Sequence, residues 1–333
     1  MNFIVSSVGG NIFDIKNIAS YISEFDKTVK FSENFIKTPF LVGNMRTLVL
    51  AVGTWFIYIT INNFISKRKI DFYDISIIII SMVLSLLNGS RTPLFFMISS
   101  GLVYFLLITT MNNKQINNKF DLKILLKVGI VGIAFLCLFG TFAKMLGRDI
   151  KENPMDYLAI YCGAEVKNLD LFLQEDHDRD AQYFGAQTFQ PLIASIGRKI
   201  DSDAFENYKL DLPFRKVGGY NLGNVYTTFY PYIYDFGYPG LVFFVMIMAF
   251  ISQIIYEKAQ KIKDGYPSIW TIAYGSVFSC LLLSFFSNKF YENVFTTDFV
   301  KRLIIWYLCI LFFCKFDFKK MMKKLKHKKK FNM

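Results

Sequence analysis

The feature that most constrains this chain is the grouping of its apolar residues into long blocks. Of its 333 residues, 53% are hydrophobic and 19% charged, against about 25% charged in an ordinary soluble domain. A block of about 20 apolar residues can cross the roughly 30 Å hydrocarbon core of a membrane as a helix. We find seven such blocks and predict an all-α, polytopic transmembrane bundle with spans at 41–65, 72–88, 93–111, 124–146, 237–256, 268–286 and 299–316.

One block leaves an alternative open. The segment 72–88 is short and rich in Ile, so it also fits one arm of a buried hairpin. The other blocks are too long for typical strands, and the chain lacks the ten-residue alternating pattern of an outer-membrane barrel.

The basic residues predict the orientation, because short loops that hold Lys and Arg usually stay in the cytoplasm. Under strict alternation the basic segments 67–69, 114–123 and 258–263 and the tail all fall on one side. The tail holds nine Lys and one Asp between 315 and 330, a net +8 of the chain's +12. We expect it to contact anionic lipid. Nucleic acid is not an expected partner, because no aromatic platform accompanies the lysines.

This alternation divides the chain into five parts. They are an extracytoplasmic start (1–40), spans one to four (41–146), a large, partly helical extracytoplasmic loop (147–236), spans five to seven (237–316) and a basic cytoplasmic tail (317–333). The first 40 residues are polar and carry no signal peptide. Export of such a segment without a preceding span is unusual. Either the start departs from the ordinary insertion rules or a longer form has upstream helices, and we expect the second. The five cysteines predict no disulfide framework.

The large loop contains one stretch with helical periodicity. Its apolar residues predict an amphipathic helix that lies against the membrane or the bundle, with Tyr161 and Glu165 one turn apart on it; the apolar stripe is Leu158, Cys162, Val166, Leu169 and Leu173. The acidic run 175–180 lacks the Gly and the distal Glu of a calcium loop, so we interpret it as a solvated turn. No metal site is predicted, since the only histidines are His177 and His327.

A second part of the loop mixes sugar-binding groups with aromatic rings. The segment 218–240 carries amide, hydroxyl and carboxylate groups among many rings, just where a span begins; its candidate glycan-binding residues are Asn224, Tyr226, Tyr230 and Tyr234. The alternative is an aromatic belt at the membrane interface. A belt explains the Tyr residues but does not explain Asn224 and Asp235.

Three arginines are candidates for binding phosphate. Arg91 lies in a tight turn between two spans, and Arg198 and Arg215 lie in the large loop. Ionisable residues near an intramembrane site are functional candidates, and the planar fork of donors on Arg suits phosphate.

Four stretches together resemble a known family: GSRT at 89–92, YCGAEVKNLD at 161–170, FGAQTF at 184–189, and NVYT at 224–227 leading to YDFGYPG at 234–240. The chain resembles the bacterial oligosaccharide repeat unit polymerases, the Wzy-type O-antigen and capsule polymerases. The resemblance extends over nearly the whole chain and departs at the start, where family members usually carry several more spans.

The resemblance implies a metal-independent glycosyltransferase without a cofactor, in the bacterial cytoplasmic membrane. A polyprenyl-pyrophosphate-linked glycan would be transferred, on the outer face, to another lipid-linked repeat unit, and the lipid pyrophosphate would leave. Arg91, Arg198 and Arg215 would then converge on the pyrophosphate and stabilise it. Asp235, ahead of Glu165, would act as the general base, although Asp235 also fits an N-cap of the helix expected from Gly237. The implied partners are this lipid-linked oligosaccharide, the bilayer and a chain-length regulator.

Two other functions stay open. An O-antigen ligase has a related architecture but typically relies on a His in its outer loop, and His177 is distant in sequence from the other candidates. A flippase or transporter for the same glycan would place charges inside its spans and show internal repeats. We find no convincing repeat, and the polar residues concentrate in one loop.

Overall fold

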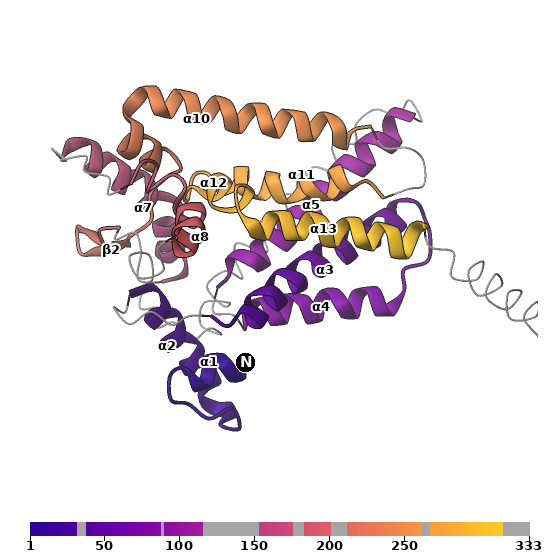
Figure 1. Cartoon of the computed structure of the whole chain (residues 1–333), viewed down its shortest axis with the longest axis horizontal. Helices are drawn as coiled ribbons and strands as arrows, with labels where there is room; N and C mark the ends of the chain where they lie inside the picture. Colours follow the sequence, from indigo (N-terminus) through magenta and orange to yellow (C-terminus); the bar gives the residue numbers. More distant parts are fainter. Residues whose placement is uncertain are drawn as a thin grey trace, which may run out of the picture.

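The computed structural model describes residues 1–31, 38–87, 90–115, 153–175, 183–200, 212–261 and 267–315. These parts of the chain are mostly helical, with a single small two-stranded sheet among them. Six helices run roughly side by side as a bundle (Figure 1): α3 (Phe40–Ile65), α4 (Phe72–Leu86), α5 (Thr92–Gln115), α10 (Phe229–Ala259), α11 (Ile269–Leu282) and α13 (Thr297–Ile310). A short π-helical turn, η2 (Leu311–Lys315), continues α13.

Three helices in the described ranges are long and apolar enough to cross a membrane: α3, α5 over Thr92–Met111, and α10. Their outer faces carry exposed large apolar side chains, as at Phe243, Met246 and Phe250 of α10. In water such continuous apolar faces would be a liability, whereas in a bilayer they contact lipid. The expected helical bundle is therefore confirmed in outline.

The other predicted spans have different outcomes. α4 is a helix and not a hairpin arm, but α4 and α11 are apolar helices of only 15 and 14 residues, shorter than the roughly 20 that a straight span needs. α13 and η2 together cover most of the block at 299–316. The block at 124–146 and the basic tail lie outside the described residues.

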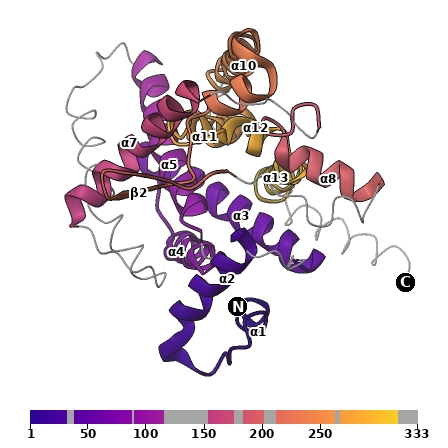
Figure 2. The same ribbon diagram turned by 90° about the vertical axis from the view of Figure 1, so that its left-hand side faces the viewer.

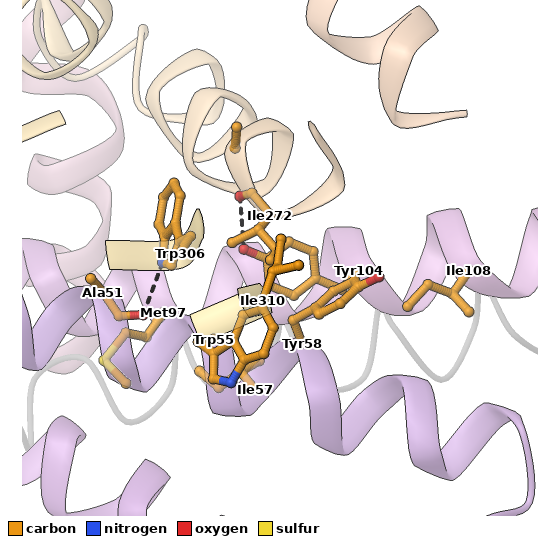
Figure 3. Packing of buried hydrophobic residues seen from close by; sticks show 11 residues of the cluster. Ala51, Trp55, Ile57, Tyr58, Met97, Tyr104, Ile108, Ile272, Trp306 and Ile310 are labelled. Carbon is orange, nitrogen blue, oxygen red and sulfur yellow. Dashed lines mark hydrogen bonds between the residues drawn. The ribbon is translucent and has the colours of Figure 1, made fainter. Parts of the chain in front are cut away.

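The bundle is held by aromatic side chains that satisfy their own polar atoms. Trp306 of α13 donates from Nε1 to the carbonyl of Ala51, 2.9 Å away, and the Tyr104 hydroxyl donates to the carbonyl of Ile272, also at 2.9 Å (Figure 3). Without water, an unsatisfied N–H or O–H would cost several kcal/mol. These bonds join α13 to α3 and α5 to α11 through a shared core.

The two ends of the bundle differ in what they carry. At one end, hereafter the loop end, gather α7 (Pro154–Gln174), α8 (Gln190–Ile200), the hairpin of β1 (Arg215–Val217) and β2 (Tyr220–Gly223), and α12 (Lys289–Val294), as Figures 1 and 2 show. At the opposite end, individual side-chain contacts join α3, α10 and α11. There the Ser268 N–H donates to the Tyr58 hydroxyl at 3.2 Å, and Lys258 lies 4.2 Å from the Trp270 ring centroid.

The first residues also pack at the loop end. α1 (Asn2–Ser6), the 3-10 turn η1 (Ile15–Asn17) and α2 (Ile18–Phe31) form a small unit. Its buried residues Ile4, Ile22 and Phe25 pack against Leu86 and Leu87 at the end of α4.

α10 contains a break that the sequence places at the start of a span. The helix begins at Phe229, and Gly237 interrupts it with φ 67° and ψ −167°. Such a backbone is open to Gly and strained for other residues. The first segment is largely buried, with Tyr230, Pro231, Tyr232 and Ile233 all inside the protein. After the break, the helix runs along the bundle (Figure 1), and several of its large apolar side chains are exposed.

The helix predicted in the large loop is present as α7, but most of the described residues of its apolar stripe are exposed. Cys162, Val166 and Leu173 are exposed. The face that packs inward instead carries Glu165 and Asn168, which are fully buried. Leu169 of the stripe is partly buried against the cluster of Phe172, Tyr226, Tyr230 and Ile233, so the stripe packs inward only in part.

Candidate functional site

The site begins with Arg91, directly before α5. Its Nη2 donates to the Tyr161 hydroxyl at 2.8 Å and its Nη1 to the Tyr157 hydroxyl at 3.3 Å. Its Cζ lies 5.1 Å from the centre of the Tyr161 ring, which is within cation–π range. These two tyrosine hydroxyls orient the guanidinium. Arg91 is thereby fixed against α7, 70 residues away in sequence.

The two tyrosines that hold Arg91 form a packed pair. Their ring centroids lie 4.8 Å apart, and the Tyr161 ring stacks on Phe286, 6.2 Å away and nearly parallel. Phe286 belongs to the connection between α11 and α12. Burial and the neighbouring Tyr161 raise the pKa of the Tyr157 hydroxyl to about 12, so Tyr157 stays neutral at physiological pH.

Glu165 lies one turn beyond Tyr161 on the same face of α7. Its side chain is fully buried, and neither carboxylate oxygen has a hydrogen-bond partner among the residues that the structure describes. Burial raises the pKa of Glu165 to about 7, an effect that its own backbone N–H slightly offsets. A general base works best with a pKa near the operating pH.

A second unsatisfied acceptor follows Glu165 on the same face. Asn168 is fully buried and donates from Nδ2 to the carbonyl of Val225 at 2.8 Å and to that of Gly223 at 3.4 Å. Its Oδ1 is buried and has no partner in the described part of the chain. Buried polar atoms are almost always paired in folded proteins, so two neighbouring residues with free acceptors suggest a bound donor.

Asn168 also fixes the β hairpin on α7. The strands are joined by Gly218 and Gly219, both with positive φ; a two-residue turn with two positive φ values suits the twist of a hairpin. This hairpin was not predicted, although the Gly-Gly pair between short strands was a usable signal.

Arg215 lies on β1 at the far end of α7. It forms a two-pronged ion pair with Glu175 and donates from Nε to the Tyr226 hydroxyl at 3.0 Å. Both partners raise the pKa of Arg215. Fourteen residues of helix separate Tyr161 from Glu175, about 20 Å along the axis, so the structure does not bring Arg215 to Arg91. Arg198 is exposed in the last turn of α8.

Asp235 is engaged with another element. Its two carboxylate oxygens accept from the backbone N–H groups of Gln187 (3.2 Å) and Thr188 (2.7 Å), just before α8. Thr188 is fully buried, and its carbonyl accepts from Asn288 Nδ2 at 2.8 Å. The Tyr232 hydroxyl donates to Asn288 Oδ1 at 3.1 Å. Asp235 therefore belongs to a buried network that ties the segment before α8 to α10 and α12.

The four candidate glycan-binding residues are unequally placed. Tyr226 and Tyr230 are buried with ring centroids 4.4 Å apart, and Tyr230 packs edge-on against Phe172 at 4.6 Å. Asn224 and Tyr234 are half-buried, and the latter lies 5.8 Å from Tyr230. These rings form a small core with α7, and Tyr234 and Asn224 are the two with accessible surface.

No known protein family, curated protein or solved structure matches this chain. A functional hypothesis therefore has to rest on the residues described above.

Proposed function

We propose that this chain is a membrane glycosyltransferase that joins polyprenyl-pyrophosphate-linked oligosaccharide repeat units on the outer face of a bacterial cytoplasmic membrane. One observation carries the proposal. On one face of α7, Tyr161 binds Arg91, and Glu165 and Asn168 follow within two turns. The carboxylate oxygens of Glu165 and the Oδ1 of Asn168 have no hydrogen-bond partner among the described residues. A glycosyl diphosphate offers the complement, with anionic oxygens for the guanidinium and hydroxyl donors for the acceptors.

The reaction assigns one role to each group. Glu165 takes the proton from a hydroxyl of the acceptor sugar while that oxygen bonds to the anomeric carbon of the donor. The bond between this carbon and the phosphate oxygen breaks, and the electron pair leaves with the lipid diphosphate. Arg91 stabilises the charge that develops on this diphosphate. The tyrosine hydroxyls hold the guanidinium in place in advance, which lowers the cost of reorganisation.

Asp235 and Arg215 have structural roles in this proposal. Asp235 already accepts two backbone hydrogen bonds, and Arg215 is neutralised by Glu175. Glu165 is thus preferred to Asp235 as the base, and Arg91 is preferred among the three arginines. Asn224 and Tyr234 remain the candidates for sugar contact.

The arrangement of the bundle supports an extracytoplasmic position for the loop end, which the proposed reaction requires. Arg91, α7, α8 and the hairpin gather at the loop end, whereas Lys67, Arg68 and Lys258 lie at or beyond the opposite ends of their helices. Short basic loops favour the cytoplasm, so we place the loop end outside. The seven-span count and the cytoplasmic tail belong to the same proposal.

Deletion of the gene in its native bacterium tests the function. We expect the surface polysaccharide to be reduced to single repeat units, with repeat units accumulating on the lipid carrier. Wild-type protein should restore polymer, and Glu165→Gln and Arg91→Gln should not. Full-length polymer that stays on the carrier would instead indicate a ligase, and repeat units confined to the inner face would indicate a flippase.

A further inference from the structure

A second guanidinium lies at the loop end and was not among the predicted site residues. Arg46 is in the second turn of α3, inside a helix long enough to span a membrane. Its Nε and Nη2 are buried and have no hydrogen-bond partner in the ranges that the structure describes. An ionisable side chain in such a helix is expensive, and it usually faces a partner or a substrate.

Two contacts between α3 and α5 define the position of Arg46 along the bundle axis. Gly53 of α3 packs against Met97 of α5, and Ile57 packs against Gly101. Both contacts pair residues 44 positions apart, so the two helices run parallel and in step. On this register Arg46 lies level with the residues just before Thr92, where Arg91 is located.

The face of α3 gives the direction of Arg46. Arg46 precedes Gly53 by seven residues, which is close to two turns, so the two share a face. Gly53 packs against Met97 of α5 and Ser81 of α4. Arg46 therefore faces the junction of α4 and α5, about 10 Å above Gly53 at 1.5 Å per residue. That junction is the turn that carries Arg91.

We infer that Arg46 is a second binding residue for the lipid diphosphate, facing the same substrate as Arg91 from the neighbouring helix. This inference rests on the proposed function. Arg91 is oriented by the tyrosines of α7, while Arg46 projects from α3 with its Nε and Nη2 buried. A diphosphate with two phosphoryl groups can engage both cations, whereas a monophosphate has only one phosphoryl group to offer.

The state of Arg46 without ligand agrees with a binding role. Two buried donors without partners destabilise the folded protein. A purely structural arginine would be expected to have acceptors in the surrounding helices, as Trp306 and Tyr104 have. Binding sites commonly retain such local destabilisation, because the missing partner is the ligand.

Binding by the purified full chain in phosphatidylcholine nanodiscs tests the inference. The probes are undecaprenyl diphosphate, undecaprenyl monophosphate and phosphatidylglycerol, added to the wild type, Arg46→Gln and Arg91→Gln. We expect each substitution to weaken diphosphate binding at least about tenfold, the loss of one charge-assisted contact. Arg46→Gln should affect monophosphate binding much less. The matched control is Arg68→Gln, an exposed arginine just past the other end of α3, which should change neither.

The melting temperature without ligand provides the second measurement. Arg46→Gln should melt at or above the wild-type temperature, because it removes a buried charge. A clearly lower melting temperature would mean that Arg46 is structural and would overturn the inference. Unchanged diphosphate binding by a folded Arg46→Gln protein would overturn it too. So would phosphatidylglycerol binding that equals diphosphate binding and depends on Arg46. A wild-type protein that binds no diphosphate would also overturn it.

The outcomes separate this inference from the proposed function. If polymer forms in cells and Arg46→Gln leaves both polymer and binding unchanged, only the role of Arg46 is rejected. If diphosphate binding depends on Arg46 but deletion of the gene leaves polymer intact, the site stands and the polymerase function is rejected.

Discussion

Tyr161 holds Arg91 in two ways at once, with its hydroxyl 2.8 Å from Nη2 and its ring centre 5.1 Å from Cζ. Tyr161→Phe separates the two contacts, because it keeps the ring and removes the hydroxyl. A hydrogen bond to a charged group contributes about 1.5–3 kcal/mol, so polymer synthesis should fall at least about tenfold. Tyr157→Phe should have a smaller effect, since its contact is 3.3 Å long.

The control for this pair is Tyr307→Phe, which alters an exposed ring of α13. Polymer synthesis is measured with purified protein and lipid-linked repeat units. Wild-type rates in Tyr161→Phe would remove Arg91 from the leaving-group site.

The raised pKa of Glu165 makes activity depend on pH. A base must be deprotonated, so the wild-type rate should rise with pH and level off above about pH 7, the pKa that burial gives this carboxyl. Glu165→Gln should be inactive throughout. A rate profile in which the wild type has no inflection between about pH 6 and 8 would contradict the assignment.

The same pKa makes stability depend on pH, with a sign that can be worked out. The folded-state pKa of about 7 exceeds the ordinary 4.5, so the folded protein holds its proton while the unfolded chain ionises. Stability is therefore lost as the pH rises from about 4.5 to about 7. Glu165→Gln should exceed the wild type in unfolding free energy by up to about 3 kcal/mol at pH 8, at about 1.4 kcal/mol per pKa unit.

At pH 4 this difference should vanish, because Glu165 is protonated in both states. Melting curves at the two pH values give the measurement. Glu257→Gln, at an exposed position of α10, serves as the control and should show no such pH dependence.

Asp235 is expected to stabilise the fold. Its carboxylate accepts from two backbone N–H groups, whereas an amide has one acceptor oxygen and would turn its own donors towards the second N–H. Asp235→Asn should therefore lower the unfolding free energy by about 1–3 kcal/mol and reduce protein levels. Asp298→Asn, which alters an exposed pair with Lys301 on α13, should have little effect. A variant Asp235→Asn with wild-type melting and no polymer would make Asp235 the base instead.

The membrane side of the loop end can be read by cysteine labelling in intact cells. In a chain with Cys162→Ser, single substitutions Ile200→Cys and Lys67→Cys place a thiol at the exposed end of α8 and at the exposed turn after α3. We expect an impermeant maleimide to label the first and not the second. The reverse pattern would put the loop end in the cytoplasm and reject the proposed function.

Helix formation was predictable from the apolar blocks, since the period and length of such blocks depend on local sequence alone. α3, α5 and α10 follow the predicted ranges closely, except that α10 begins eight residues early. That difference arises because 229–236 is polar and aromatic, so it does not read as membrane sequence, yet it is buried by Phe172 and the segment before α8.

The sequence could not predict which face of α7 packs against the rest of the protein. Periodicity identifies an apolar stripe, and in a soluble protein that stripe would face the core. Near a membrane the preference can reverse, because apolar side chains have lipid to face and polar ones need the protein. Glu165 was named as a candidate base, but its burial without a partner depends on α7 packing with this polar face inward.

The sequence also could not show which of the three predicted arginines lie together. Arg215 was a candidate because it is a cation in a loop, and only the fold reveals its ion pair with Glu175. Arg46 lies within an apolar block, so its sequence context does not mark it as a site residue. Its importance depends on register with α5, which no local pattern encodes.

The break at Gly237 divides α10 into a buried first segment and a long apolar helix. In a continuous helix, each inserted residue rotates everything after it by about 100°. An insertion near Tyr230 would then rotate the whole span about its axis. Because Gly237 interrupts the helix, an insertion or deletion in the segment 229–236 need not rotate the remainder of α10 against α11.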